Sequence, residues 1–106
     1  MPLVFSKING VKGRVEIPEL GAPICEIATG TLTRRATEGP DSDFWDLHAV
    51  LLYSNAMLFA DPDYHKVVWI QLPGKTFVLC AEEGEPKMTL HGKSLVVERV
   101  KLCPPK

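Results

Sequence analysis

The stretch Lys66–Ala81, KVVWIQLPGKTFVLCA, most limits the folds that are open to this chain. Two runs of β-branched, aliphatic and aromatic residues flank Pro73-Gly74, a pair that favours a turn because proline fixes φ and glycine accepts the positive φ that follows. The stretch therefore predicts a β-hairpin. Neither run alternates regularly between apolar and polar residues, so both faces of the hairpin are expected to be covered. A small protein meets that requirement most simply with a closed barrel or a sandwich.

The chain has 106 residues, which predicts one domain, 1–106, with a single core. Its apolar runs fall short of the roughly 20 residues that a membrane-spanning helix needs, and its start lacks the pattern of a signal peptide. A cytoplasmic protein with no membrane partner is expected. The net charge of −1 argues against a strongly basic nucleic-acid binder, but the basic residues fall on the predicted strands or at their ends.

The three cysteines, Cys25, Cys80 and Cys103, are odd in number and widely spaced. This pattern argues against a disulfide framework and, in a reducing compartment, predicts free thiols. Cys25 and Cys80 lie in apolar runs, where a cysteine is typically a small buried hydrophobic residue.

Two strands are expected in the first 35 residues. In Leu3–Ile17 the glycines Gly10 and Gly13 interrupt an apolar strand pattern, which suggests a bulge or a tight bend. After a turn, Ile24–Arg35 is rich in β-branched residues and ends on two arginines, as a second strand would. A polar loop is expected over 36–42.

The segment Phe44–Tyr53, FWDLHAVLLY, fits either a strand or a helix. A helix would align Phe44, Leu47 and Leu51. The strand is favoured, and its predicted inner face carries Trp45, Leu47, Ala49, Leu51 and Tyr53. A short helix or turn over Ser54–Ala60 should follow, capped by Ser54 or Asn55 and ended by Asp61-Pro62.

After the hairpin, Glu82–Pro86 predicts a second turn, and Lys87–Leu102 predicts a final strand that is broken near Gly92. The order of elements indicates an all-β protein. It fits a five-stranded Greek-key barrel of the OB type, with one short helix or turn between strands 3 and 4.

Several motifs are similar to known single-strand-binding proteins. Gly13-Arg14, then Pro18-Glu19-Leu20, the strand ICEIAT and the aromatic-led FWDLHAVLL resemble the opening of bacterial single-stranded-DNA-binding proteins. The closing SLVVERVKLCPPK resembles the last strand of filamentous-phage single-strand-binding proteins. The turn after Pro-Glu-Leu is shorter than in the bacterial family, and the acidic C-terminal tail is missing. The resemblance implies a divergent OB-fold relative, of a phage, plasmid or primosomal protein N-like type, that binds single-stranded DNA in replication, recombination or repair.

OB folds bind single strands by stacking bases on aromatic rings while cations follow the phosphates. The stacking candidates are Trp45, Tyr53, Tyr64, Trp69 and Phe77. The phosphate-binding candidates are Arg34, Arg35, Lys66, Lys75, Lys87 and Lys93. For Trp69 and Phe77 burial in the core is favoured over stacking, and Arg34-Arg35 is the strongest electrostatic candidate. The expected ligand is single-stranded DNA, with RNA left open.

Catalysis finds little support in the sequence. His48, His65 and His91 are isolated and lack metal-ligand spacing, and no phosphate-binding loop or nucleophile elbow is present. No enzyme activity, cofactor or metal is expected. The alternative function is a protein-interaction β-barrel module, OB-like or PH-like, without nucleic-acid binding. A homodimer or higher homo-oligomer is expected, with the stretch from Val67 to Leu79 contributing to its interface.

Overall fold

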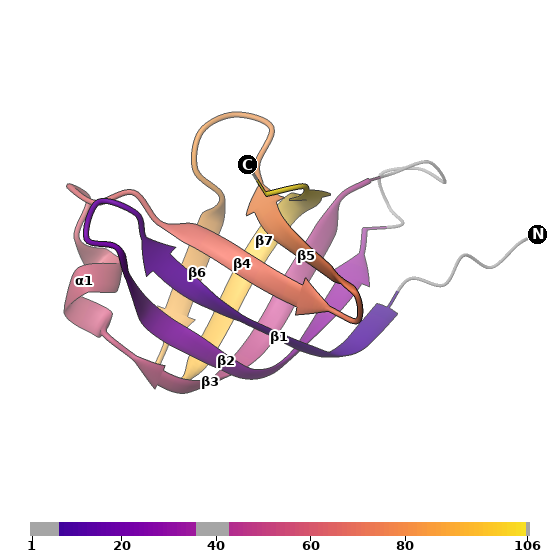
Figure 1. Ribbon diagram of the computed structural model, residues 1–106, viewed down its shortest axis with the longest axis horizontal. Helices are drawn as coiled ribbons and strands as arrows, with labels where there is room; N and C mark the ends of the chain where they lie inside the picture. The colour runs from indigo at the N-terminus through magenta and orange to yellow at the C-terminus, as the bar shows by residue number, and fades with distance from the viewer. Residues whose placement is uncertain (1–6, 36–42, 106) are drawn as a thin grey trace, which may run out of the picture.

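The computed structural model describes residues 7–35 and 43–105, and these residues form seven strands and one short helix (Figure 1). The elements are β1 (Lys7–Ile17), β2 (Ala22–Arg34), β3 (Trp45–Ser54), α1 (Ala56–Ala60), β4 (Val67–Leu72), β5 (Lys75–Cys80), β6 (Lys87–His91) and β7 (Ser94–Cys103). The predicted all-β class is confirmed. The loop predicted over 36–42 lies outside the described residues.

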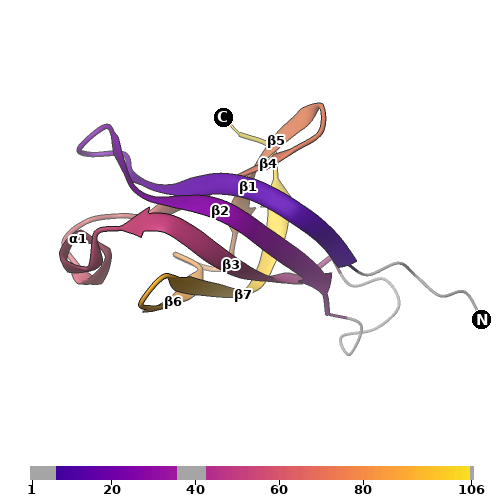
Figure 2. The ribbon, with the colours of Figure 1, turned by 90° about the horizontal axis from the view of Figure 1, so that it is seen from below.

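The strands form one closed antiparallel sheet. Its order is β3-β2-β1-β4-β5-β7-β6, and β3 also pairs with β7. Six strands therefore return on themselves as a ring, and β6 is attached to β7 outside that ring. Figure 2 shows the β6–β7 hairpin at one side of the molecule, away from β1. The closed sheet agrees with the sequence, but it contains seven described strands where five were predicted.

Part of this difference comes from the final segment, which is a hairpin instead of one broken strand. His91 of β6 pairs with Ser94 of β7, so the connection consists of Gly92-Lys93 alone. Gly92 has a positive φ of 64°, which suits the first central position of a type II′ hairpin turn. The hairpin that was predicted from the sequence is confirmed, because Leu72 pairs with Lys75 around Pro73-Gly74.

The core fills the inside of the ring. Its buried apolar residues come from six strands and include Val11, Val15, Ile17, Ile27, Leu32, Leu47, Leu51, Val68, Ile70, Leu79, Leu95, Val97 and Val100. The helix α1 lies between β3 and β4, as predicted, and packs Leu58 and Phe59 against this core. Asn55 caps the helix, because its side-chain oxygen accepts a hydrogen bond of 3.1 Å from the Leu58 amide.

Closure of the ring depends on a close approach of β1 to β4. The register of β1 against β2 shifts on both sides of Val11, so the bulges predicted from the glycines are present. Gly13 pairs with Ile70 of β4, and a Cβ atom at Gly13 would collide with the Trp69 carbonyl oxygen. Only glycine lets β1 lie between β2 and β4 at this point.

The strand interpretation of residues 44–53 is correct, with one residue on the wrong face. Leu47, Ala49 and Leu51 face the core, as predicted. Tyr53, which the same alternation places beside them, is 43% exposed. A bulge explains this: Ile27 of β2 pairs with Leu51 whereas Glu26 pairs with Tyr53, so one extra residue reverses the alternation.

Only one face of the β4–β5 hairpin is covered by the rest of the protein, so the prediction that both faces are covered is wrong. Val68, Ile70 and Leu79 point into the core and are buried. On the opposite face Trp69 and Val78 are half-buried and line an open groove. The apolar residues on that outer face belong to a surface site instead of a second core.

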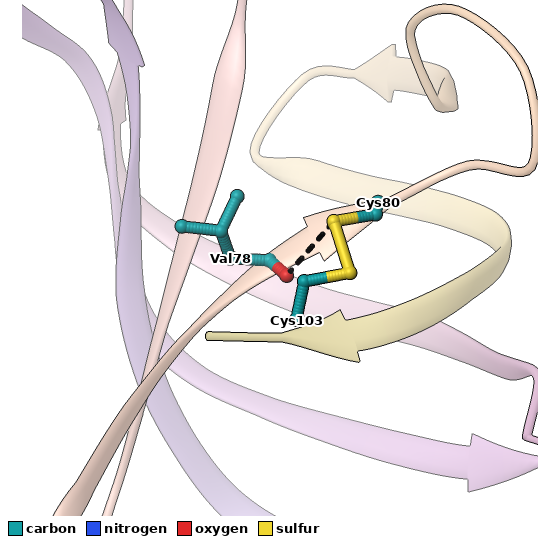
Figure 3. The surroundings of a disulfide bond; sticks show 3 residues. All are labelled: Val78, Cys80 and Cys103. Atoms are coloured by element: carbon teal, nitrogen blue, oxygen red, sulfur yellow. Dashed lines mark hydrogen bonds between the residues drawn. A yellow bond between two sulfur atoms is a disulfide. The ribbon is translucent and has the colours of Figure 1, made fainter. Parts of the chain in front are cut away.

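Cys80 and Cys103 form a disulfide, so the prediction against disulfides is wrong for these two residues (Figure 3). The two cysteines are 23 residues apart in the sequence, so their spacing does not reveal the pairing. In the structure β5 pairs with β7, and this brings the two Cα atoms to 6.1 Å. Cys25 is a buried free thiol, as predicted. Burial raises the pKa of Cys25, and a backbone hydrogen bond at Asn55 offsets part of that rise, so this thiol is not an activated nucleophile.

Candidate nucleic-acid interface

Arg34 and Trp45, two of the predicted binding residues, lie directly opposite each other where β2 ends and β3 begins. Both line an open hollow of about 340 Å³ together with Lys101 of β7. Trp45 is half-buried and packs against the core, which fixes its ring. Asp43 is also part of the lining. This depression, the Trp45 hollow, brings two cations and an aromatic ring together.

A larger and almost wholly apolar groove of about 560 Å³ adjoins the Trp45 hollow. Its lining comprises Val67, Trp69, Val78, Cys80, Cys103, Pro104 and Pro105. The two depressions share Cys103 and Pro104, so they adjoin each other at the end of β7. We call the larger depression the Trp69 groove.

A third hollow of about 320 Å³ lies on β1, β2, β3 and the end of β4, and is lined by Lys12, Arg14, Glu26, Tyr53 and Gln71 among others. The register places Tyr53 opposite Glu26 and Glu26 opposite Arg14. Arg14 is in turn opposite Trp69, and its guanidinium lies 4.8 Å from the centroid of the Trp69 ring. Neighbouring strands are about 4.8 Å apart, so this row runs for about 14 Å across the sheet. Through Arg14 this Tyr53 hollow adjoins the Trp69 groove.

We call the three adjoining depressions the track. Its cations are Lys12, Arg14, Arg34 and Lys101, and its carboxylates are Glu26 and Asp43, with Glu16 also 3.5 Å from the Arg14 guanidinium. The net charge along the track is therefore only weakly positive. Its aromatic residues stand beside these cations, with Trp45 at one end, Tyr53 at the other and Trp69 between them.

A fourth depression of about 410 Å³ has a different character. Its lining contains Arg35, Ala81, Glu82, Glu83, Glu85, Lys87, Glu98 and Arg99. The cations here are paired with carboxylates: Arg99 contacts Glu82 at 2.8 Å, and Lys87 lies 3.7 Å from Glu98. Arg35, a predicted phosphate ligand, lies 3.5 Å from Asp46. We call this depression the acidic hollow. Arg35 and Lys87 line it and do not line the track.

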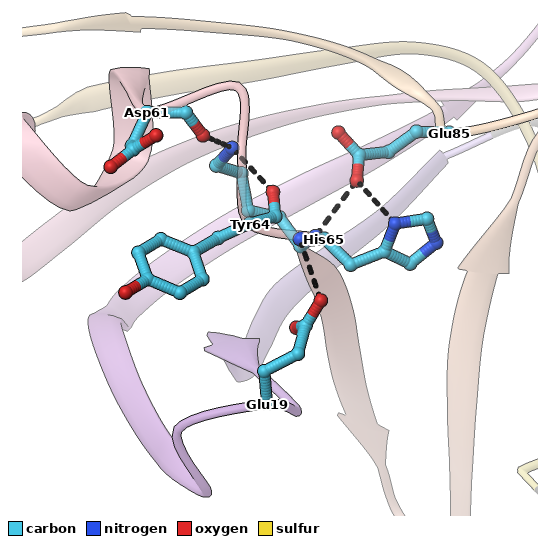
Figure 4. Close-up of polar contacts among 6 residues, drawn as sticks. Glu19, Asp61, Tyr64, His65 and Glu85 are labelled. Atoms are coloured by element: carbon cyan, nitrogen blue, oxygen red, sulfur yellow. Dashed lines mark hydrogen bonds and ion pairs between the residues drawn. The ribbon is translucent and has the colours of Figure 1, made fainter.

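Lys66 and Tyr64, two more predicted binding residues, have structural contacts (Figure 4). The Lys66 ammonium donates to the carbonyl oxygens of Asp61, at 2.6 Å, and Tyr64, at 2.8 Å. Lys66 is only 8% exposed, and its backbone amide donates to Glu85 at 2.7 Å. Tyr64 packs against the core. We therefore leave both residues out of the candidate interface.

The remaining predicted residues divide between the surface and the core. Lys75 and Lys93 are exposed at the two hairpin turns and do not line the track. Phe77 is half-buried and packs against the core, which agrees with the prediction for it. Sequence reasoning did not select Lys12, Arg14 and Lys101, which line the track. The spacing of Lys12 and Arg14 around Gly13 in a predicted strand was a usable signal, since alternate residues share a face.

Three further features of the described residues bear on function. Their His, Cys, Asp and Glu side chains do not gather in a group of three or more that could hold a metal ion. None of their helices has the length and apolar character needed to cross a membrane. Every buried side-chain nitrogen or oxygen among them has a hydrogen-bond partner.

Comparison with protein-family models, curated proteins and solved structures finds no match for this chain. The resemblance to single-strand-binding proteins therefore stays a prediction from short motifs.

Proposed function

We propose that the protein binds single-stranded nucleic acid along the track, with single-stranded DNA in replication, recombination or repair as its ligand. One observation carries this proposal: three half-buried or exposed aromatic residues, Trp45, Trp69 and Tyr53, lie in adjoining depressions with cations beside them. Rings held by strands offer stacking surfaces, and cations beside them can follow a phosphate backbone.

The charges along the track suggest how binding energy is divided. Stacking contributes about 1–3 kcal/mol for each base, so three rings can supply most of a micromolar affinity. The four cations are offset by nearby carboxylates, and about two to four phosphate contacts are expected. Since each contact on a single strand contributes about −0.7 to the slope of log affinity against log salt, that slope should be about −1.5 to −3.

We also propose that the closed sheet is a variant of the OB type. Two features support this assignment: β1 pairs with both β2 and β4, and α1 lies between the third and fourth strands. The variant has additional strands, of which β6 lies outside the ring. No catalytic step is part of the proposal.

A cytoplasmic location is also part of the proposal, and it predicts the redox state of Cys80 and Cys103. Disulfides are rare in that compartment, so Cys80 and Cys103 should be a dithiol inside the cell and pair on oxidation. Trapping thiols with an alkylating reagent at the moment of lysis tests this, and a fully oxidised pair would contradict the location.

A protein-interaction module is the second candidate, and the Trp69 groove favours it. The groove has an apolar lining of about 560 Å³ and could receive apolar side chains of a protein partner. Salt separates the two functions, because phosphate contacts release counterions and contacts with apolar side chains do not.

The deciding experiment is fluorescence anisotropy of a labelled oligo-dT, titrated with the protein at low and moderate salt. A duplex of the same length tests for single-strand preference, and oligo-rU tests for RNA. Binding to the single strand that weakens as salt rises is expected. No binding to either single strand at low salt would overturn the proposal and leave the interaction module as the better account.

A further inference from the structure

The outer edge of β6 is the feature of the sheet that the proposed function leaves unexplained. Within residues 7–35 and 43–105, each of the other six strands has neighbours on both sides, whereas β6 pairs with β7 alone. The stretch from Val67 to Leu79, where the sequence places the oligomer contact, forms β4 and most of β5 inside the ring. β4 pairs with β1 and β5, and β5 pairs with β4 and, over Val78–Cys80, with β7, so neither strand has an edge that is free along its whole length.

The geometry of the β6–β7 hairpin determines which groups face outward. His91 and Ser94 flank a two-residue turn, so they form a hydrogen-bonded pair, and the pairs alternate from there along the ladder. His91, Thr89 and Lys87 therefore direct their backbone groups toward β7. Met88 and Leu90 direct their amides and carbonyls away from the sheet, where no described strand pairs with them.

This edge is complementary to itself. If a second β6 lies antiparallel with Thr89 opposite its own copy, each Met88 lies opposite Leu90 of the second copy. The outward backbone groups of these residues then form two narrow pairs with four hydrogen bonds. The side chains of Met88 and Leu90 are only half-buried in one chain, and the second strand would cover them further. On the opposite face the two exposed threonines meet, a favourable cross-strand pair.

Neighbouring registers lose these contacts. Centring the pair on Met88 places Pro86, which has no amide hydrogen, opposite Leu90 of the second copy. Centring it on Leu90 places Met88 opposite Gly92, which lies in the turn and not in a strand.

We propose that the chain forms a two-fold symmetric dimer by antiparallel pairing of β6 with β6 of a second copy, centred on Thr89. The contact uses the same strand of both chains, so it closes at two subunits. Pro86 and the five-residue length of β6 end the pairing and prevent a longer ladder. An interface this small belongs at the low end of specific complexes, so the dimer should dissociate on dilution in the micromolar range. The dimer contact uses no residue of the track, so it can be tested independently of nucleic-acid binding.

Sedimentation velocity over a concentration range of about 10–500 µM tests the dimer, since weak complexes are populated there. Wild-type protein should shift from monomer to dimer. Thr89→Lys and Thr89→Glu each place like charges opposite each other and should stay monomeric, with unchanged thermal stability because Thr89 is exposed. An equimolar mixture of the two variants pairs opposite charges and should restore the dimer. The matched control is Thr76→Lys, an exposed strand threonine on β5, which should behave as wild type.

A cysteine at the two-fold axis provides a second test. Directly opposite residues in a non-hydrogen-bonded pair have Cα atoms about 4.5 Å apart, within the range for disulfides. Thr89→Cys should give a covalent dimer under mild oxidation, and Thr76→Cys should not. Wild-type protein that remains monomeric throughout, or a Thr89→Lys variant that dimerises as wild type does, would overturn the proposal. A mixture of the charged variants that stays monomeric would overturn the register.

Discussion

The track and the acidic hollow are both open depressions that contain several cations, yet they differ in their balance of charge: cations outnumber carboxylates in the lining of the track, and carboxylates outnumber cations in the lining of the acidic hollow. In the track the Arg14 guanidinium lies 4.8 Å from the centre of the Trp69 ring. In the acidic hollow Arg99 lies 3.9 Å from the centre of the Phe44 ring, but it also contacts Glu82 at 2.8 Å, and Lys87 lies near Glu98. A phosphate would meet aromatic surface and modest positive charge in the first, and neutralised cations among carboxylates in the second. The number of cations therefore says less about anion binding than their neighbours do.

The two depressions also differ in construction. The row from Tyr53 to Trp69 is set by strand register, so its geometry belongs to the sheet itself. The acidic hollow includes residues of the loop between β5 and β6, which Glu85 ties to the chain before β4 by accepting from the Lys66 amide (Figure 4). Changes that disturb the sheet should affect the track, and changes in the loop should leave it intact.

The largest expected effect is on the free energy of unfolding. A pair of glycine variants, one in the sheet and one in the loop, compares the two kinds of construction. In Gly13→Ala the new methyl group collides with the backbone of β4 beneath the track, and we expect a loss of about 4 kcal/mol or more in unfolding free energy. In Gly84→Ala, in the loop, no atom lies within 4 Å of the new methyl, and only the positive φ of 68° opposes it, at a cost of about 1–2 kcal/mol. Urea unfolding of both variants measures the difference. Equal losses would contradict the distinction between sheet and loop.

The next largest effect is expected from the disulfide. It closes a loop that contains β6, most of β7 and the turn between β5 and β6, which lines the acidic hollow. Replacing Cys80 and Cys103 together by serine should cost about 3 kcal/mol, because the cross-link restricts a loop of this length in the unfolded chain. The β5–β7 pairing spans only Val78 to Cys80, so amides of β5, β6 and β7 should lose the most protection in hydrogen exchange. Loss of protection spread evenly through β1 and β2 would contradict a local role.

Local signals made much of this fold predictable. The turn at Pro73-Gly74, the helix cap at Asn55 and the apolar alternation from Leu47 to Leu51 each depend on residues close together in sequence. The disulfide was missed for the opposite reason. Cys80 meets Cys103 only because β5 pairs with β7, and a pairing between distant segments leaves no mark in the spacing of the residues.

The candidate site was predictable to a smaller extent. Arg34 and Trp45 were identified because a strand end and a strand start are visible in the sequence, and register then places them together. Lys66 was misjudged, since its partners are the carbonyl oxygens of Asp61 and Tyr64, which no residue type reveals. Tyr53 was identified, although its predicted face was wrong, because the bulge that turns it outward depends on the pairing with β2.

A smaller effect tests stacking on the track. Tyr53→Ala removes an exposed ring without opening the core, and a lost base stack should weaken oligo-dT binding by about 1–3 kcal/mol. Met57→Ala is the control, because Met57 is 84% exposed and does not line the track. Anisotropy titrations of both variants at one salt concentration measure the difference. Equal affinities for the two variants would remove Tyr53 from the interface.

The smallest effect compares the charges of the two depressions directly. Lys101→Gln removes a cation of the Trp45 hollow, and Lys87→Gln removes one from the acidic hollow. If Lys101 contacts one phosphate, its loss should weaken binding by about 1 kcal/mol and reduce the salt slope by about 0.7, whereas Lys87→Gln should change neither. Oligo-dT titrations at four salt concentrations give both quantities. A reduced slope in Lys87→Gln and not in Lys101→Gln would place the phosphates in the acidic hollow, because counterion release reports where the backbone lies independently of how tightly the bases stack.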